Sequence, residues 1–139
     1  MALAYQVVVM NQGRIEDEGS PERVYARPAT RFAATFMGES TLIPGNFRNG
    51  TFRTPLGSFA LPDPAMVVAI RPEHVRLGGD VEAIVRDVVY QGSFKRVTAH
   101  AAAAPELAIL ARLPAETRIS AGERVRLGFD PSHLIPLRS

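Results

Sequence analysis

Few side chains in this 139-residue sequence are of types that perform catalysis, and those few are widely separated. His74, His100 and His133 lack the short helical spacing of zinc ligands, so we expect no metal site. Ser93 has no neighbouring histidine to activate it as a nucleophile. Cysteine is absent, which excludes thiolate chemistry and a disulfide framework. We therefore expect no catalytic residue and no enzyme acting in isolation.

An acidic run, Glu16 to Glu18, falls within a strand-like segment. Two interpretations are a catalytic carboxylate pair and an exposed strand edge. Charged residues on an edge strand prevent aberrant pairing with another chain. We favour the exposed edge.

The segment Ala69 to Leu77 joins an apolar strand to a polar turn and then returns to strand. Met66 to Ile70 is an apolar run of strand length, and Pro72 cannot donate a hydrogen bond to a sheet. Strand pairing should therefore stop at the proline. The residues presented at this strand end are Arg71, Glu73 and His74.

Two interpretations of this strand end remain open. Arg71 and Glu73 could form an ion pair that closes a tight turn, or the end could be a rim that meets a ligand or another subunit. If the strand end is a rim that binds an oxyanion or small solute, polar residues further along the chain would also contribute to the site. The candidate ligand-binding residues are Arg71, Glu73, His74, Ser93, Lys95 and Arg96.

Composition favours a small folded domain rich in short strands. Hydrophobic residues make up 46% and charged residues 22%, so the chain can bury a core. The 11 glycines and 11 prolines favour many turns over long helices. The net charge of +2 is spread along the chain without an aromatic stripe, which favours a solvated surface over a nucleic-acid interface. Because the sequence shows neither a signal peptide nor a membrane-spanning run, we expect no direct membrane insertion.

The first part of the chain predicts a hairpin followed by two short helices. Tyr5 to Met10 and Arg14 to Glu18 are strand-like runs around a glycine-containing loop. Ser20 and the following proline predict a helix that ends near Ala26, and Thr30 can cap a second helix. Helical spacing places four apolar residues on one face of that second helix, where we expect core packing: Phe32, Ala33, Phe36 and Met37.

The remainder predicts a series of strands. Asn49-Gly50 is the preferred dipeptide of a tight hairpin turn. Gly78 to Asp80 is expected to turn the chain into the next strand, and a shift of phase beyond Asp87 predicts a bulge. The later expected strands are Val81 to Tyr90, Phe94 to Ala101, Leu107 to Leu113, Glu123 to Phe129 and Leu134 to Leu137.

Two stretches of this sequence resemble a known family. Ile-Arg-Pro-Glu-His-Val-Arg-Leu, at residues 70–77, resembles the signature of the TOBE domain, the accessory barrel of many bacterial ABC importer ATPase subunits. The series Val7 to Gly19, Ser20 to Tyr25 and Arg31 to Gly38 resembles the end of the nucleotide-binding domain in the same subunits. Val88 to Ala99 resembles a strand-turn-strand motif of the family, with Gln91 in place of the usual leucine.

The resemblance implies a C-terminal fragment of a polyamine, iron or sugar importer ATPase. It predicts a mainly β fold, a small oligonucleotide/oligosaccharide-type barrel preceded by a β-hairpin and short helices. Residues 1–41 would be the remnant of the nucleotide-binding domain and residues 42–139 the TOBE domain. The sequence contains no Gly-x-x-x-x-Gly-Lys-Ser/Thr loop, so this chain is not expected to act as an ATPase. ATP and magnesium would be the cofactors of the full-length family member.

The resemblance also implies partners and a location. The full-length family pairs with transmembrane permease subunits, is cytoplasmic and lies peripheral to the inner membrane. We expect a homodimer and no nucleic-acid partner. The candidate dimer contact is the apolar helix face of Phe32, Phe36 and Met37. The alternative function is a stand-alone barrel that binds an oxyanion or small solute.

Overall fold

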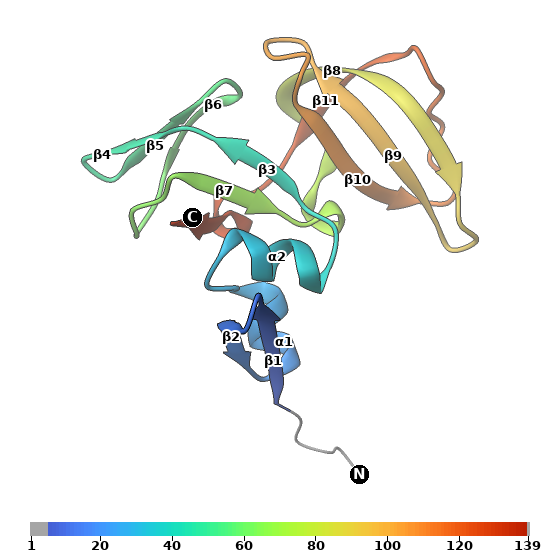
Figure 1. The fold of residues 1–139 in the computed structure, drawn as a ribbon. Coiled ribbons are helices and arrows are strands. Elements are labelled where there is room, and N and C mark those ends of the chain that lie inside the picture. The colour runs from blue at the N-terminus through green and yellow to red at the C-terminus, as the bar shows by residue number, and fades with distance from the viewer. Residues whose placement is uncertain (1–5, 139) are drawn as a thin grey trace.

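The computed structural model describes residues 6–138. An N-terminal hairpin and two helices lie at one end, next to a larger body of strands (Figure 1). The hairpin consists of β1 (Val7–Asn11) and β2 (Arg14–Gly19), and the helices are α1 (Pro21–Ala26) and α2 (Arg31–Met37). The Ser20 and Thr30 hydroxyls accept hydrogen bonds from backbone N–H groups in the first turn of their helices. The predicted hairpin and both helix caps are therefore confirmed, while Tyr5, the first residue of the expected hairpin, lies outside the described residues.

Two three-stranded antiparallel sheets follow the helices. One has the order β12-β7-β3 and the other β4-β5-β6. Asn49 and Gly50 have φ angles of 51° and 78°, which fit the left-handed turn that their sequence predicts. The strands are β3 (Thr41–Pro44), β4 (Asn46–Arg48), β5 (Thr51–Thr54), β6 (Gly57–Ala60), β7 (Val67–Ile70) and β12 (Ile135–Leu137).

The last sheet has four antiparallel strands in the order β10-β9-β8-β11. Its register shifts between Val85 and Asp87, where the change of hydrophobic phase predicts a bulge. Short 3-10 helices η1 (Pro72–His74) and η2 (Pro131–His133) lead into β8 and β12. The strands are β8 (Arg76–Tyr90), β9 (Phe94–Ala101), β10 (Ala108–Pro114) and β11 (Arg124–Gly128).

The mainly β fold with a preceding hairpin and short helices is confirmed. The strands of residues 6–138 pair into four separate antiparallel sheets and do not form a closed ring of hydrogen-bonded strands. No helix within residues 6–138 is long and apolar enough to cross a bilayer.

The expected turn at Gly78 to Asp80 is wrong, because β8 runs continuously from Arg76 to Tyr90. A methyl group on Gly79 would collide with the backbone of Gly128 in β11. The glycine therefore permits two strands to approach closely and does not end either of them.

The hydrophobic core is divided into three clusters. The largest includes Phe52, Ile70 and Leu127 and lies among the sheets of the β body. A second joins Ala34 of α2 to β7 and β12, and a third joins Ala33 of α2 to the hairpin and α1. Helix α2 thus packs through two consecutive alanines against two different parts of the molecule.

The expected core role of the aromatic face of α2 is wrong for Phe36, whose exposed fraction is 65%. Phe32 and Met37 are only partly buried and pack at the border of the third cluster. Because the alanines fill the narrow space between the hairpin and the β body, the larger side chains lie outside it.

Candidate functional site

Arg71 lies at the junction between the helices and the β body. It follows β7, and its side chain is only 1% exposed. Its Nη1 donates to the carbonyl oxygens of Ala34 and Gly38 at 2.9 and 3.0 Å. Nε and Nη2 donate to the carbonyl oxygen of Tyr25, the second at 2.7 Å. One guanidinium therefore caps the carboxyl ends of both α1 and α2.

Two further contacts complete this arrangement. Nη1 also reaches the Ser40 hydroxyl at 2.8 Å and the Glu39 carbonyl oxygen at 3.3 Å. The guanidinium carbon lies 4.1 Å from the centre of the Tyr25 ring, a distance typical of a cation–π contact. Arg71 is thus held from several sides by the segment that precedes the β body.

Glu73 belongs to the same cluster but does not form a direct ion pair with Arg71. The Tyr25 hydroxyl donates to Glu73 Oε2 at 2.6 Å. Burial and this hydrogen bond to a carboxylate raise the pKa of Tyr25 to about 12. Burial alone would raise the pKa of Glu73, but the Tyr25 hydrogen bond and nearby positive charges hold it below its ordinary value. The interpretation of this strand end as a direct Arg71–Glu73 ion pair is therefore wrong, and Tyr25 bridges the two side chains instead.

His74 contacts a histidine far away in the sequence. Its ring stacks on that of His133, with centroids 3.8 Å apart and planes 13° from parallel. The stack joins η1 to η2. Sequence spacing separates these residues by a wide interval and offers no signal for the contact. Within residues 6–138, no set of three or more metal-ligating side chains gathers.

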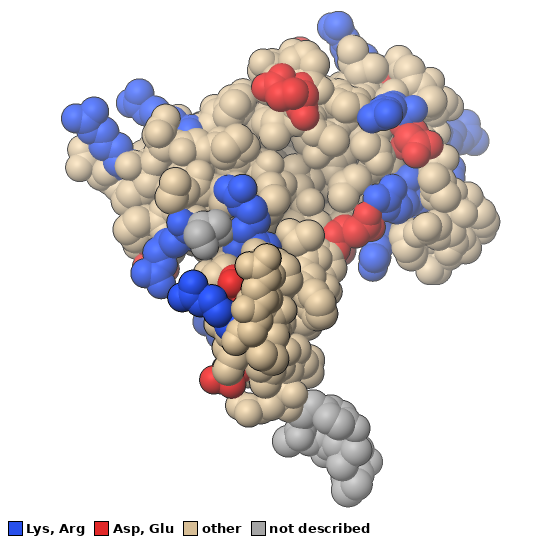
Figure 2. All heavy atoms as spheres, viewed as in Figure 1, with Lys and Arg blue, Asp and Glu red and all other residues tan. Residues whose placement is uncertain are grey.

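A cleft of about 1070 Å³ lies beside this junction. One wall is the end of α1 and the loop that follows, at residues 25–29, and another is the β6–β7 connection at residues 60–64. The remaining wall comes from residues 131–136 with Arg138, and Arg71 and His74 also line the cleft. Figure 2 shows basic side chains around the end of β12, the strand that contributes to this wall.

The remaining candidate ligand residues lie elsewhere. Ser93 is in the exposed turn between β8 and β9, Lys95 Nζ donates to the Thr117 carbonyl oxygen at 2.6 Å, and Arg96 pairs with Glu39. The structure therefore brings Arg71, Glu73 and His74 together, and it does not gather Ser93, Lys95 and Arg96 with them. Ligand binding by these six residues stays a prediction.

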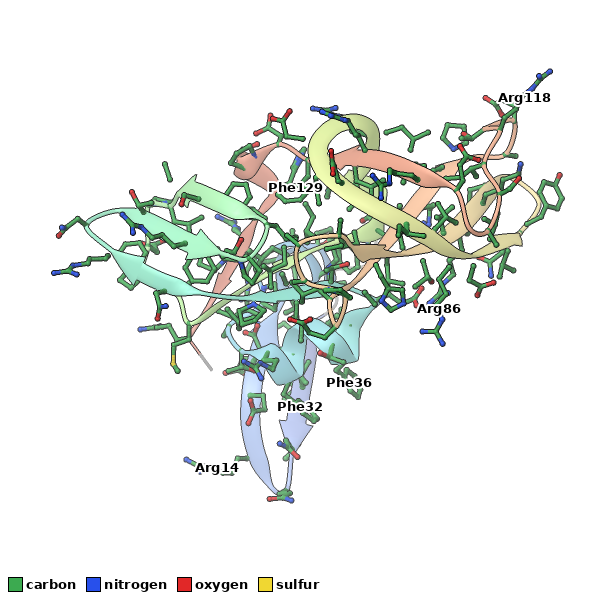
Figure 3. All side chains as sticks on the ribbon, turned by 90° about the horizontal axis from the view of Figure 1, so that it is seen from above. Arg14, Phe32, Phe36, Arg86, Arg118 and Phe129 are labelled. Atoms are coloured by element: carbon green, nitrogen blue, oxygen red, sulfur yellow. The ribbon has the colours of Figure 1, made fainter. Side chains whose placement is uncertain are left out.

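The candidate dimer residues lie on the outer side of α2. Figure 3 shows Phe32 and Phe36 side by side beside this helix, and their ring centroids are 6.1 Å apart. Because Phe36 is exposed, the stacked rings of Phe32 and Phe36 form a small aromatic surface on this side of the molecule.

Sequence reasoning missed the role of Asp17, which was expected on an exposed edge. That expectation is wrong for Asp17, because its exposed fraction is 8%. Its carboxylate accepts from Arg23 Nη2 at 2.6 Å and from the backbone N–H groups of Ala29 and Glu18 at 2.7 and 2.8 Å. It thereby ties β2 to the loop between the two helices. The three adjacent acidic residues look alike in the sequence, which does not indicate that Asp17 is buried while Glu18 is exposed.

We expect Asp17→Asn to reduce the free energy of unfolding by about 1–3 kcal/mol at neutral pH, because buried donors would lose a charged acceptor. Burial alone would raise the pKa of Asp17, but the hydrogen bonds from Arg23, Ala29 and Glu18 hold it below its ordinary value of 3.8. This stabilisation is therefore complete above the unfolded pKa and is lost as the pH falls through the lower folded value.

Urea unfolding at a series of pH values measures the effect. The difference between the parent chain and Asp17→Asn should shrink below about pH 4. Glu18→Gln, at an exposed neighbour, is the control and should change stability by less than about 0.5 kcal/mol. A difference for Asp17→Asn that is independent of pH would contradict the assignment.

The geometry defines a class of protein. Proteins of this class have a small antiparallel β domain preceded by a hairpin and two short helices. The buried arginine of an Arg-Pro-Glu segment joins the helices to the β domain. Residues 68–137 match the family model described as the TOBE domain, and this chain belongs to that family.

Comparison with curated proteins extends the similarity to the hairpin and helices. A sulfate/thiosulfate import ATP-binding protein of Brucella melitensis is 34% identical over 142 residues, covering 96% of this chain and 39% of that protein. An sn-glycerol-3-phosphate import ATP-binding protein of Paracoccus denitrificans is 33% identical over 145 residues, with 96% and 40% covered. A spermidine/putrescine import ATP-binding protein of Thermobifida fusca is 29% identical over 155 residues, again with 96% and 40% covered. The chain thus spans about two fifths of the length of these relatives.

Proposed function

We propose that this chain is the C-terminal regulatory and dimer-forming region of the ATP-binding subunit of an ABC-type solute importer. The observation that carries the proposal is the Arg71 junction, which joins a TOBE-type β body to a hairpin and two helices. Relatives named as import ATP-binding proteins align with 96% of the chain and therefore with both parts. In this proposal residues 1–41 belong to the nucleotide-binding domain and residues 42–139 form the TOBE domain.

The same proposal assigns the chemistry to the rest of the subunit. ATP hydrolysis, ATP and magnesium would belong to the full-length protein, and this chain would have no ATPase activity of its own. The partners would be the permease subunits and the remainder of the nucleotide-binding domain, with no nucleic acid bound. The subunit would be cytoplasmic and peripheral to the inner membrane.

A chimera tests this function. The region of the Brucella melitensis sulfate/thiosulfate import ATP-binding protein that aligns with this chain would be replaced by the chain itself. We expect the chimera to restore sulfate uptake in cells that lack the parent subunit, while the parent truncated before that region serves as the control. A chimera that folds and hydrolyses ATP but gives no more uptake than the truncated control would refute the proposal.

We also propose a homodimer through Phe32, Phe36 and Met37. Exposed aromatic side chains are effective anchors in interfaces, and a two-fold pair is the commonest soluble oligomer. We expect Phe36→Asp to convert the dimer to a monomer without unfolding it, since Phe36 contributes little to the core. Sedimentation across a concentration series measures the change.

A matched control is Tyr90→Asp, which changes a side chain of equal exposure at the far end of β8: the exposed fractions are 65% for Phe36 and 66% for Tyr90. This variant should remain dimeric. A parent chain that is monomeric at every concentration would refute the dimer. A dimer that survives Phe36→Asp would exclude the α2 surface as its contact.

A further inference from the structure

The cleft beside Arg71 has the size and lining of a site for a small organic molecule. Ligand sites in proteins are usually about 300–1,000 Å³ and mostly apolar with a few convergent polar groups. The walls of this cleft contain Leu61, Leu134 and Ile135 together with several prolines. Because proline has a fixed φ angle, such walls are largely formed before a ligand arrives. The prolines are Pro28, Pro62, Pro64, Pro131 and Pro136.

The polar groups of the cleft are mainly cationic. Arg27 and Arg138 are exposed and come from two different segments of the lining, and neither side chain donates to another described residue. The stacked His74 and His133 also line the cleft, whereas Asp63 is its one acidic lining residue among residues 6–138. The arrangement therefore favours a negatively charged ligand.

Arg71 adds a buried positive charge to the wall. Within residues 6–138 no carboxylate lies within 4.0 Å of its guanidinium, so carbonyl dipoles and the Tyr25 ring are its neighbours. Its Nη2 carries two hydrogens, and the described acceptor for this nitrogen is the Tyr25 carbonyl oxygen. Because Glu73 already supplies a negative charge to this cluster through Tyr25, the positive charge most available to a ligand comes from Arg27 and Arg138.

We propose that this cleft binds a small organic anion, a phosphate or carboxylate attached to an aromatic or aliphatic body. The charged group would lie between Arg27 and Arg138, and the apolar body would lie against the proline walls. A bare oxyanion would leave most of the cleft and its apolar lining unfilled. The inference goes beyond the proposed function and does not depend on it, because binding is measured on the chain itself.

Such a ligand would also link the two parts of the molecule. The cleft walls come from the α1–α2 loop on one side and from the β6–β7 connection and β12 on the other. A ligand that touches both sides stabilises the arrangement in which they lie together. Binding should therefore slow amide exchange in α1 and α2 in addition to shifting amide resonances around the cleft.

The test uses phenyl phosphate as the probe, with NMR titration of the whole chain. We expect saturable shifts confined to amides of the cleft walls, such as Ala26, Leu61, Asp63 and Ser132. Benzyl alcohol has the apolar body without the charge, and inorganic phosphate has the charge without the body. Each should bind at least about tenfold more weakly than phenyl phosphate.

A pair of double variants separates the cleft from general charge attraction. Arg27→Gln with Arg138→Gln should raise the Kd of phenyl phosphate by about tenfold or more. Arg48→Gln with Arg118→Gln removes the same charge from exposed positions outside the cleft lining, and Figure 3 shows Arg118 at the far end of the four-stranded sheet. This control pair should leave the Kd unchanged.

Three results would overturn the inference. One is the absence of saturable binding of phenyl phosphate up to its solubility limit. Another is equal weakening in both double variants, which would indicate attraction by net charge alone. The last is equal binding of inorganic phosphate and phenyl phosphate, which would remove the apolar half of the proposed ligand. A spectrum of the Arg27/Arg138 variant with unchanged dispersion establishes that it remains folded.

Discussion

Replacing Arg71 by methionine is expected to lower the free energy of unfolding by at least about 3 kcal/mol, since each buried carbonyl that loses its donor costs about 1–3 kcal/mol. Methionine retains an unbranched apolar stem, but it ends short of the guanidinium position and supplies no donor. The carbonyl oxygens of Tyr25, Ala34 and Gly38 would all lose a guanidinium partner. We expect amide exchange in α1 and α2 to rise more than in the four-stranded sheet.

Two further variants sharpen this experiment. Arg71→Lys keeps the charge but cannot bridge both helix ends with one planar group, so most of the loss should persist. Arg118→Met removes an exposed arginine and should change stability by less than about 0.5 kcal/mol. Urea unfolding gives all three values. If Arg71→Met were as stable as Arg118→Met, the junction would have no structural role.

The second large effect is expected at Gly79. Gly79→Ala would force a methyl group into the backbone of Gly128, and overpacking of this kind costs about 1–3 kcal/mol, or more when only backbone can move. We expect a loss near the upper end of that range and a weaker β8–β11 pairing, measured by urea unfolding and by amide exchange in β11.

The neighbouring Gly78 provides the control, because a substitution there would destabilise the protein for a different reason. Nothing lies within 4 Å of the position of its missing methyl, but its φ is +89°. Gly78→Ala should therefore cost only about 1–2 kcal/mol of left-handed strain. Gly78→Asn should recover part of that cost, since asparagine tolerates this conformation better. A larger loss for Gly78→Ala than for Gly79→Ala would contradict the close strand approach.

Local features of the fold could be predicted from the sequence. The Asn49-Gly50 turn and the Ser20 and Thr30 caps depend on residues only a few positions apart, and each follows the expected geometry. The bulge near Asp87 was predicted because a change of hydrophobic phase is also a local signal. Turns and caps of this kind are determined by short-range sterics and hydrogen bonding.

Features that depend on distant pairing could not be predicted. The Arg71 contacts connect residues more than thirty positions apart, and nothing near Arg71 indicates which carbonyls it will meet. The same is true of the His74–His133 stack. The segment around Arg71 was recognised as important from its proline and polar residues, yet its burial required knowledge of where the helices pack. The role of Gly79 depends in the same way on Gly128 in another strand. The partners of Asp17 are nearer in the sequence, but Arg23 and Ala29 lie in α1 and the loop after it, and the acidic run does not indicate that the chain folds back onto β2.

One consequence follows from Lys95, the single lysine of the sequence. Its ammonium donates to the Thr117 carbonyl oxygen in the loop between β10 and β11, whereas the other basic side chains are guanidinium groups and three imidazoles. A reagent that acylates amines therefore has one side-chain target in this protein. Because the nitrogen must leave the Thr117 carbonyl oxygen before it can react, the rate of acylation would follow the breaking of that hydrogen bond. The chain thus carries a built-in chemical reporter at one defined position.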